Sequence, residues 1–103
     1  MFSRNKFTSI SVHDLYDLLG KIDLIDIRET CEYNSGHIPT ATNVPIESIL
    51  AQPERYLDKS KKYHIICQSG GRSSRACDEL TSKGYNVINV AGGTGSYIRT
   101  LEI

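Results

Sequence analysis

A cysteine at the head of a glycine-containing loop is the residue whose surroundings most clearly predict chemistry. Cys67 opens the segment 67–72, which reads Cys-Gln-Ser-Gly-Gly-Arg. The two glycines allow the loop to curl until successive backbone N–H groups point at one spot, and the positive end of the following helix dipole should be directed there too. Such a loop binds anions and stabilises a thiolate over a thiol. We therefore predict that Cys67 is a catalytic nucleophile, ionised near neutral pH.

Arg72 closes the same loop with a permanently charged, planar guanidinium. This group suits an oxyanion such as thiosulfate or the negative end of a persulfide donor, and we assign it to substrate binding. Without the glycines and the arginine, a buried core cysteine would be the preferred interpretation, because that is the commonest environment of a free cysteine. The hydroxyl of Ser73 can cap the helix or reach into the loop. The predicted substrate-binding residues are Gln68, Ser69, Gly70, Gly71, Arg72 and Ser73.

Polar residues between positions 26 and 37 form a second group near a predicted strand end. Arg28 and Glu32 are four residues apart and are expected to pair directly, and Asp26 is expected to accept backbone N–H groups of a neighbouring loop. An acid–base role is the alternative for these three residues. His37 could form a dyad with Cys67, but a histidine in a Gly-His-Ile turn more often bonds the backbone and fixes the loop. We predict that Asp26, Arg28, Glu32 and His37 give structural support near the site.

The cysteines as a set do not indicate a metal site or a disulfide scaffold. The chain has three of them, at positions 31, 67 and 77, without the close paired spacing of zinc ligands. We expect Cys77 to lie in the core, and a redox disulfide between Cys31 and Cys67 is a weaker alternative. This cysteine usage fits a reducing cytoplasm, which is the expected location.

The order of the predicted elements places these residues in an α/β fold. Strands are expected at 8–10, 22–27, 43–44, 63–67 and 86–90, and helices at 11–20, 29–35, 45–50 and 73–83. Because strands alternate with helices, we expect a central, mostly parallel sheet of about five short strands with helices on both faces. Ligands of such sheets bind beyond the carboxyl ends of the strands, where Cys67 stands. Gly92, Gly93 and Gly95 should shape a second loop lining this crevice, with Tyr97 packed behind it.

Length and charge restrict the class of partner. With 103 residues, the chain fits one compact domain over residues 1–103, since a chain of this size cannot be divided into two cores. Twelve basic residues balance twelve acidic ones, so no overall field attracts nucleic acid or an anionic membrane. No apolar run is long enough to span a bilayer, and the N-terminal segment lacks the apolar stretch that directs export. The expected partners are small molecules or proteins.

Three segments of the sequence resemble motifs of the rhodanese family. Residues 26–38 read Asp-Ile-Arg-Glu-Thr-Cys-Glu-Tyr-Asn-Ser-Gly-His-Ile and look like the family's first signature, D-x-R-x-x-x-E-Y/F-x-x-G-H-I. Residues 67–72 match its active loop, C-x-x-G-x-R, and residues 90–93 resemble the segment before its last helix. Thr40 stands where the family usually has glycine, and Tyr97 where it commonly has tryptophan. The three motifs occur in the family's order and cover nearly the whole chain.

This resemblance implies a sulfurtransferase. In the family, the loop cysteine takes a sulfane sulfur from thiosulfate or a persulfide, holds it as a persulfide, and passes it to cyanide or a thiol. By resemblance, Cys67 is the carrier, a small anionic sulfur compound or persulfide is the donor, and a low-molecular-weight thiol or a protein is the acceptor. Gln68 stands where many thiosulfate-active relatives have arginine, so the resemblance favours a persulfide as the physiological donor. No metal or organic cofactor is implied.

Two other functions remain as alternatives. The first is a non-catalytic rhodanese-like module for binding or sulfur delivery, which the intact Cys67 and Arg72 disfavour. The second is a cysteine-dependent phosphatase or oxyanion reductase that uses the same thiolate. In the family's phosphatase branch the loop has one more residue, C-x5-R, whereas four residues separate Cys67 from Arg72 here. Sulfur transfer is therefore the preferred interpretation.

Overall fold

The computed structural model describes residues 7–103, and the strands of this part form one sheet. The five strands are β1 (Thr8–Ser11), β2 (Asp23–Asp26), β3 (Thr42–Asn43), β4 (Lys62–Ile66) and β5 (Asn86–Ala91). Their order is β1-β5-β4-β2-β3, and every neighbouring pair is parallel. The α/β class and the predicted parallel sheet of about five short strands are therefore confirmed. Because all strands run in one direction, their carboxyl ends lie at the same edge of the sheet.

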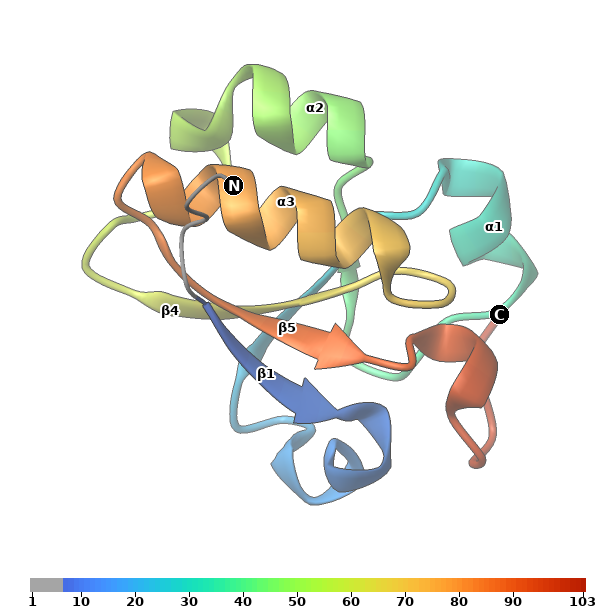
Figure 1. Ribbon diagram of the computed structural model, residues 1–103. Helices are drawn as coiled ribbons and strands as arrows, with labels where there is room; N and C mark the ends of the chain where they lie inside the picture. Colours follow the sequence, from blue (N-terminus) through green and yellow to red (C-terminus); the bar gives the residue numbers. More distant parts are fainter. Residues whose placement is uncertain (1–6) are drawn as a thin grey trace.

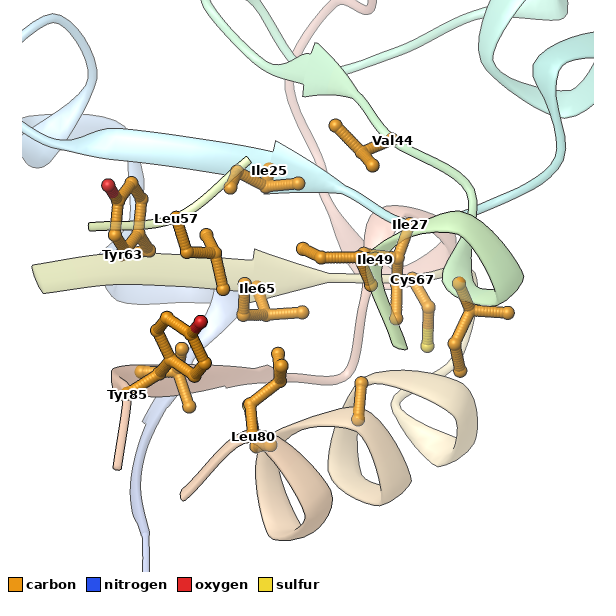
Figure 2. Close-up of a cluster of buried hydrophobic side chains, with 14 residues drawn as sticks. Ile25, Ile27, Val44, Ile49, Leu57, Tyr63, Ile65, Cys67, Leu80 and Tyr85 are labelled. Carbon is orange, nitrogen blue, oxygen red and sulfur yellow. The ribbon is translucent and has the colours of Figure 1, made fainter. Parts of the chain in front are cut away.

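The helices α2 (Ile46–Ala51) and α3 (Gly71–Ser82) lie together on one face of the sheet, as Figure 1 shows. Between them and the strands lies the first hydrophobic core, drawn in Figure 2. Tyr63 and Ile65 of β4 belong to this core, while Ile66 points to the opposite face, as the two-residue period of a strand requires. Cys67 continues the alternation and joins the first core. β4 is thus buried on both faces, which is typical of a parallel strand.

The opposite face is covered mainly by short 3-10 helices (Figure 1). The first two are η1 (Val12–Asp14) and η2 (Tyr16–Leu18). Val12 and Leu15 pack there against Ile66 and Val90, and the partly buried Tyr33 of the helix α1 (Thr30–Ser35) extends the cluster. Helices therefore lie on both faces of the sheet, as predicted, but only one face has long α-helical cover.

The single helix predicted for residues 11–20 is wrong. The chain makes consecutive 3-10 turns instead, in which the N–H of Leu15 donates to the carbonyl of Val12 at 3.1 Å and the N–H of Leu18 donates to that of Leu15 at 2.9 Å. Val12 and Leu15 are the buried residues of this segment, and a spacing of three places both on one side of a 3-10 turn. Ser11 begins the first turn by accepting a backbone N–H on its hydroxyl. Two apolar side chains are buried in this way without a full α-helix.

The remaining helices start close to the predicted positions, with one shift that affects the loop. α1 and α2 lie within one residue of the predicted ranges, and the short turn η3 (Pro53–Arg55) follows α2. α3 begins at residue 71 instead of 73, so Arg72 and Ser73 lie in its first turn. Gly70, just before it, has a φ of 109°, which favours glycine. None of the helices within residues 7–103 has the length and apolar character needed to cross a membrane.

Candidate active site

Cys67 is the first residue after β4, and backbone N–H groups surround its sulfur. Figure 2 shows it at the carboxyl end of β4, with its side chain directed toward the helices on that face. Its Sγ accepts the N–H of Gly70 at 3.1 Å and the N–H of Ser73 at 3.3 Å. The residue is 1% exposed, so protein groups rather than solvent determine the charge state of the sulfur. The loop and the first turn of α3 therefore form the predicted inward-facing set of N–H donors.

The pKa of the Cys67 thiol is lowered from its ordinary value. Burial is the largest single influence and raises this pKa, but the hydrogen bonds together outweigh it. They come from the hydroxyl and the N–H of Ser73 and from the N–H groups of Gly70 and Ser69. The Ser73 hydroxyl lies 3.4 Å from the sulfur and 3.2 Å from the Gly70 carbonyl oxygen, so it can serve either group. The loop thus stabilises the nucleophilic form of Cys67.

Arg72, in the first turn of α3, forms a two-armed ion pair with Glu32 of α1. Its Nη1 donates to Oε1 at 2.8 Å and its Nη2 donates to Oε2 at 3.0 Å. The hydrogen bond from Arg72 is the main cause that lowers the pKa of Glu32 to about 2, and Glu32 raises the pKa of Arg72 in turn. The guanidinium that the sequence assigns to substrate binding is therefore held by a carboxylate.

Arg28 is buried before α1 and connects the first motif to the active loop. α1 begins at Thr30, so Arg28 lies outside the helix, and the predicted pairing of Arg28 with Glu32 is wrong. Its Nη2 donates instead to Asp26 Oδ2 at 2.8 Å, and its Nη1 donates to Gln68 Oε1 at 3.1 Å. Asp26 accepts the backbone N–H of Arg28 itself, at 3.0 Å, where the prediction named a neighbouring loop. A buried arginine thus fixes the side chain that follows Cys67.

The segment after β5 holds the active loop through backbone hydrogen bonds. The N–H of Thr94 donates to the carbonyl of Cys67 at 2.8 Å, and the N–H of Gly95 donates to that of Gln68 at 2.9 Å. Gly93 has a φ of 68°, and a Cβ there would lie 2.5 Å from the carbonyl carbon of Gln68. Only glycine fits this position. The predicted second glycine loop therefore lies against the active loop. Apart from the glycines, no residue pattern indicates this backbone pairing.

His37 contacts α1 and the C-terminal segment. Its ring stacks on Tyr33 with 3.8 Å between ring centroids, and its Nδ1 lies 3.0 Å from the Tyr33 carbonyl oxygen. Its backbone N–H donates to the carbonyl of Glu102, and the N–H of Glu102 donates to the carbonyl of His37, both at 2.8 Å. These are backbone bonds of the predicted kind, and none of them involves Cys67. Tyr97, predicted behind the glycine loop, packs against the second core.

The other two cysteines have different environments. Cys77 of α3 is buried in the first core, where burial, with a smaller contribution from the charge of Cys67, raises its pKa to about 12. Cys31 of α1 is exposed. All three thiols are free, so a disulfide between Cys31 and Cys67 stays a prediction. Within residues 7–103, no three His, Cys, Asp or Glu side chains gather as ligands of a metal ion would.

The chain is similar to a family model and to proteins of known sequence. Residues 11–100 match the family described as the rhodanese-like domain. The chain is 43% identical over 70 residues to a Bacillus subtilis protein named "Putative sulfurtransferase YtwF", and the match covers 68% of this chain and 67% of that protein. It is 36% identical over 77 residues to a protein named "Sulfurtransferase" from Allochromatium vinosum, with coverage of 74% and 71%. Two further Bacillus subtilis relatives are matched over only 58% and 39% of their length.

The solved structures include the same fold. The crystal structure of SSP1007 from Staphylococcus saprophyticus superposes with a TM-score of 0.86 at 32% identity, covering 94% of this chain and 100% of that chain. The matched residues 11–100 span the loop at Cys67, the ion pair of Asp26 and Arg28 before α1, and the glycine loop after β5. On these grounds, the chain belongs to the rhodanese-like domain family.

Proposed function

We propose that the chain is a sulfurtransferase that carries a sulfane sulfur as a persulfide on Cys67. Membership of the family and the names of the two sulfurtransferase relatives support sulfur transfer in general. The finer proposal is carried by one observation, the hydrogen bonds from the N–H groups of Gly70 and Ser73 to a buried sulfur whose pKa is lowered. A thiolate so placed is the nucleophile that sulfane sulfur transfer needs.

In the first half-reaction, the Cys67 thiolate attacks the outer sulfur of the donor. A bond forms between Cys67 Sγ and that sulfur, and the bond between the two donor sulfurs breaks. The electron pair of the broken bond leaves with sulfite when the donor is thiosulfate, and with a thiolate when the donor is a persulfide. The persulfide formed on Cys67 is itself an anion, and the N–H groups of the loop are already oriented to stabilise negative charge there.

In the second half-reaction, the acceptor attacks the outer sulfur of the Cys67 persulfide. The sulfur–sulfur bond breaks, and its electron pair returns to Cys67 Sγ as the thiolate that Gly70 and Ser73 stabilise. One set of donors therefore serves both halves of a ping-pong cycle. We propose a thiol, cyanide or a protein as the acceptor, and a reducing cytoplasm as the compartment in which the three thiols stay free.

The mass of the intact protein tests the carrier step. The reduced protein is incubated with thiosulfate or glutathione persulfide, and the wild type is compared with Cys67→Ala. We expect the wild type to gain one sulfur atom, which added thiol removes, and the variant to gain none although it retains Cys31 and Cys77. Cys31→Ala, which removes the exposed cysteine, is the matched control and should gain sulfur like the wild type.

Two outcomes would contradict the proposal. If the wild type gains sulfur from neither donor, a binding or delivery module becomes the better interpretation, and turnover of an aryl phosphate then tests the phosphatase alternative. If Cys67→Ala gains sulfur as readily as the wild type, the carrier is a different cysteine.

A further inference from the structure

A cavity lies near the edge of the sheet that is opposite to the active loop. It has a volume of about 340 Å³, and its lining includes Lys21, Lys62 and His64. Lys62 is the first residue of β4, and Cys67 follows the last. The cavity and the reactive sulfur are therefore at opposite ends of this strand, roughly 16 Å apart along it. The lining residues also lie outside the three segments that resemble rhodanese motifs.

His64 is a buried histidine that the fold does not hold by a hydrogen bond at Nδ1. Its neighbours on β4, Tyr63 and Ile65, point into the first core, so the ring of His64 lies on the opposite face. The residue is 5% exposed, and its Nδ1 is buried without a hydrogen-bond partner in the described part of the chain. His37, by contrast, places its Nδ1 3.0 Å from the carbonyl oxygen of Tyr33. Since buried polar groups are normally hydrogen-bonded, the ring of His64 is available to a ligand in the cavity that it lines.

Positive charge surrounds this ring. Burial is the main cause that lowers the pKa of His64, and the charge of Lys62, two residues earlier on the same face of β4, lowers it further. Lys21 joins the lining from the segment before β2. Among residues 7–103, neither lysine pairs with a carboxylate. Asp23, also in the lining, lies 3.5 Å from Lys61, which compensates its charge. The cavity therefore combines two unpaired ammonium groups with a neutral histidine.

We propose that this cavity binds a phosphoryl dianion, held by the ammonium groups of Lys21 and Lys62 and by a ring N–H of His64. Hydrogen bonds from ammonium groups to phosphate oxygens are among the strong ones, and a neutral histidine still donates one N–H. A volume of about 340 Å³ exceeds that of inorganic phosphate and is within the range of small-molecule sites, so a phosphate ester of a small molecule fits the space. The site shares no residue with the active loop, and the inference does not depend on sulfur transfer.

Proton NMR of the histidine rings tests the site at His64 itself. The chain has three histidines, and the exposed His13 and the stacked His37 are internal controls. The protein is titrated with inorganic phosphate or with glycerol phosphate at about pH 7.5, where a phosphate ester is a dianion. Sodium chloride keeps the ionic strength constant. We expect the ring signals of His64 to shift with saturation and those of the controls to shift little. Because the active loop can also bind an anion, only a shift at His64 counts.

Two lysine variants distinguish a specific site from a general effect of charge. Lys62→Gln removes an ammonium group of the lining and should weaken binding, measured at His64, by about tenfold or more, the contribution of one charge-assisted hydrogen bond. Lys59→Gln is the matched control, because it removes the same charge from the same segment outside the lining. The Nζ of Lys59 lies 5.2 Å from the ring centroid of Tyr85, which belongs to the first core. This variant should change the affinity less than about threefold.

Each possible result decides the inference. A saturable shift at His64 that Lys62→Gln weakens supports it, and the tighter of the two probes identifies the ligand as inorganic phosphate or as an ester. The absence of a shift at His64, the same shift with sodium chloride alone, or equal weakening in Lys59→Gln and Lys62→Gln overturns it. The signals of His13 and His37 report whether each variant is folded. None of these results bears on the Cys67 carrier, which the intact mass tests separately.

Discussion

Two cysteines of the same hydrophobic core have opposite acidities. Cys67 and Cys77 are 1% and 0% exposed, and both belong to the core between the sheet and α3. Burial raises the pKa of Cys77 to about 12, whereas the hydrogen bonds to Cys67 outweigh burial and lower its pKa. The N–H groups in the first turn of a helix have no partner within the helix, whereas those in its middle do. Cys67 faces the first turn of α3, and Cys77 lies in its middle. The availability of helix N–H groups, and not the depth of burial, therefore causes the difference in pKa between the two thiols.

The largest expected effect is on the reaction of the two thiols with a small alkylating reagent. The thiolate fraction falls tenfold for each unit by which the pKa exceeds the pH, so at neutral pH we expect Cys67 to react at least about a thousandfold faster than Cys77. Peptide mass spectrometry after brief exposure to iodoacetamide measures both rates. The exposed Cys31 is the control for reagent activity. Equal rates for Cys67 and Cys77 in folded protein would contradict the difference in acidity between the two thiols.

The next largest effect is on stability and concerns the segment after β5 that is hydrogen-bonded to the Cys67 loop. Gly93→Ala should lower the free energy of unfolding by about 2–4 kcal/mol, because its Cβ would lie 2.5 Å from Gln68 and its φ is 68°. Gly71→Ala is the control for stability, since a Cβ there meets no atom within 4 Å. Urea denaturation measures both. Similar stability of the two variants would contradict the close approach of the two loops.

A smaller effect is expected from the hydroxyl of Ser73, and it distinguishes this group from the backbone N–H donors at Cys67. Ser73→Ala removes the hydroxyl that lies 3.4 Å from the sulfur, and should raise the pKa of Cys67, because the hydrogen bond from this side chain is one of the causes that lower it. The rate of sulfur loading rises with pH as the thiolate forms, so the variant's profile should shift to higher pH. Ultraviolet absorbance of the thiolate measures the midpoint. Ser74→Ala, one residue further along α3, is the matched control. An unchanged midpoint in Ser73→Ala would leave the backbone N–H groups as the sole cause.

The smallest effect concerns the ion pair beside Cys67. The pKa of Glu32 is lowered from 4.5 to about 2, so the pair stabilises the fold above pH 4.5 and this contribution is lost as the pH falls from 4.5 toward 2. The side chains are 32% and 35% exposed, which limits the contribution to less than about 1 kcal/mol. Urea denaturation of wild type and Glu32→Gln at neutral and acidic pH measures it. The difference in stability between the two proteins should shrink on acidification, and a constant difference would contradict the pairing.

The sequence predicts the reactive loop better than the charge pairs around it. A loop with two glycines between Cys67 and Arg72 can curl so that its N–H groups point inward, and this tendency is visible in the residues of the loop itself. The partners of Arg28 and Glu32 depend on where α1 begins. Because it begins at Thr30, the spacing of four residues does not place them on one helical face, and each finds its partner elsewhere. A hydrophobic or capping pattern in the sequence does not locate the first residue of a helix to better than one or two positions.

The fold shows the same distinction between local and distant determinants. Buried strands such as β2 and β4 are apolar runs that the sequence displays directly. The segment 11–20 has apolar residues at spacings that fit an α-helix or a 3-10 helix, and only Val12 and Leu15 of this segment are buried. The hydrogen bonds from Thr94 and Gly95 to the loop join residues that are about a quarter of the chain apart. A pattern within a short segment of the sequence cannot predict a contact between such distant residues.

The hydrogen bonds from the segment after β5 have a consequence for the newly synthesised chain. β5 is the last strand of the sheet in sequence but lies between β1 and β4, and the residues behind it fix the carbonyls of Cys67 and Gln68. While the ribosome is still making this segment, β4 lacks one neighbour and the loop at Cys67 lacks its support. The cysteine of a nascent chain is then an ordinary thiol. It acquires its lowered pKa only when the sheet closes, so an unfinished copy lacks the stabilised thiolate of the folded protein.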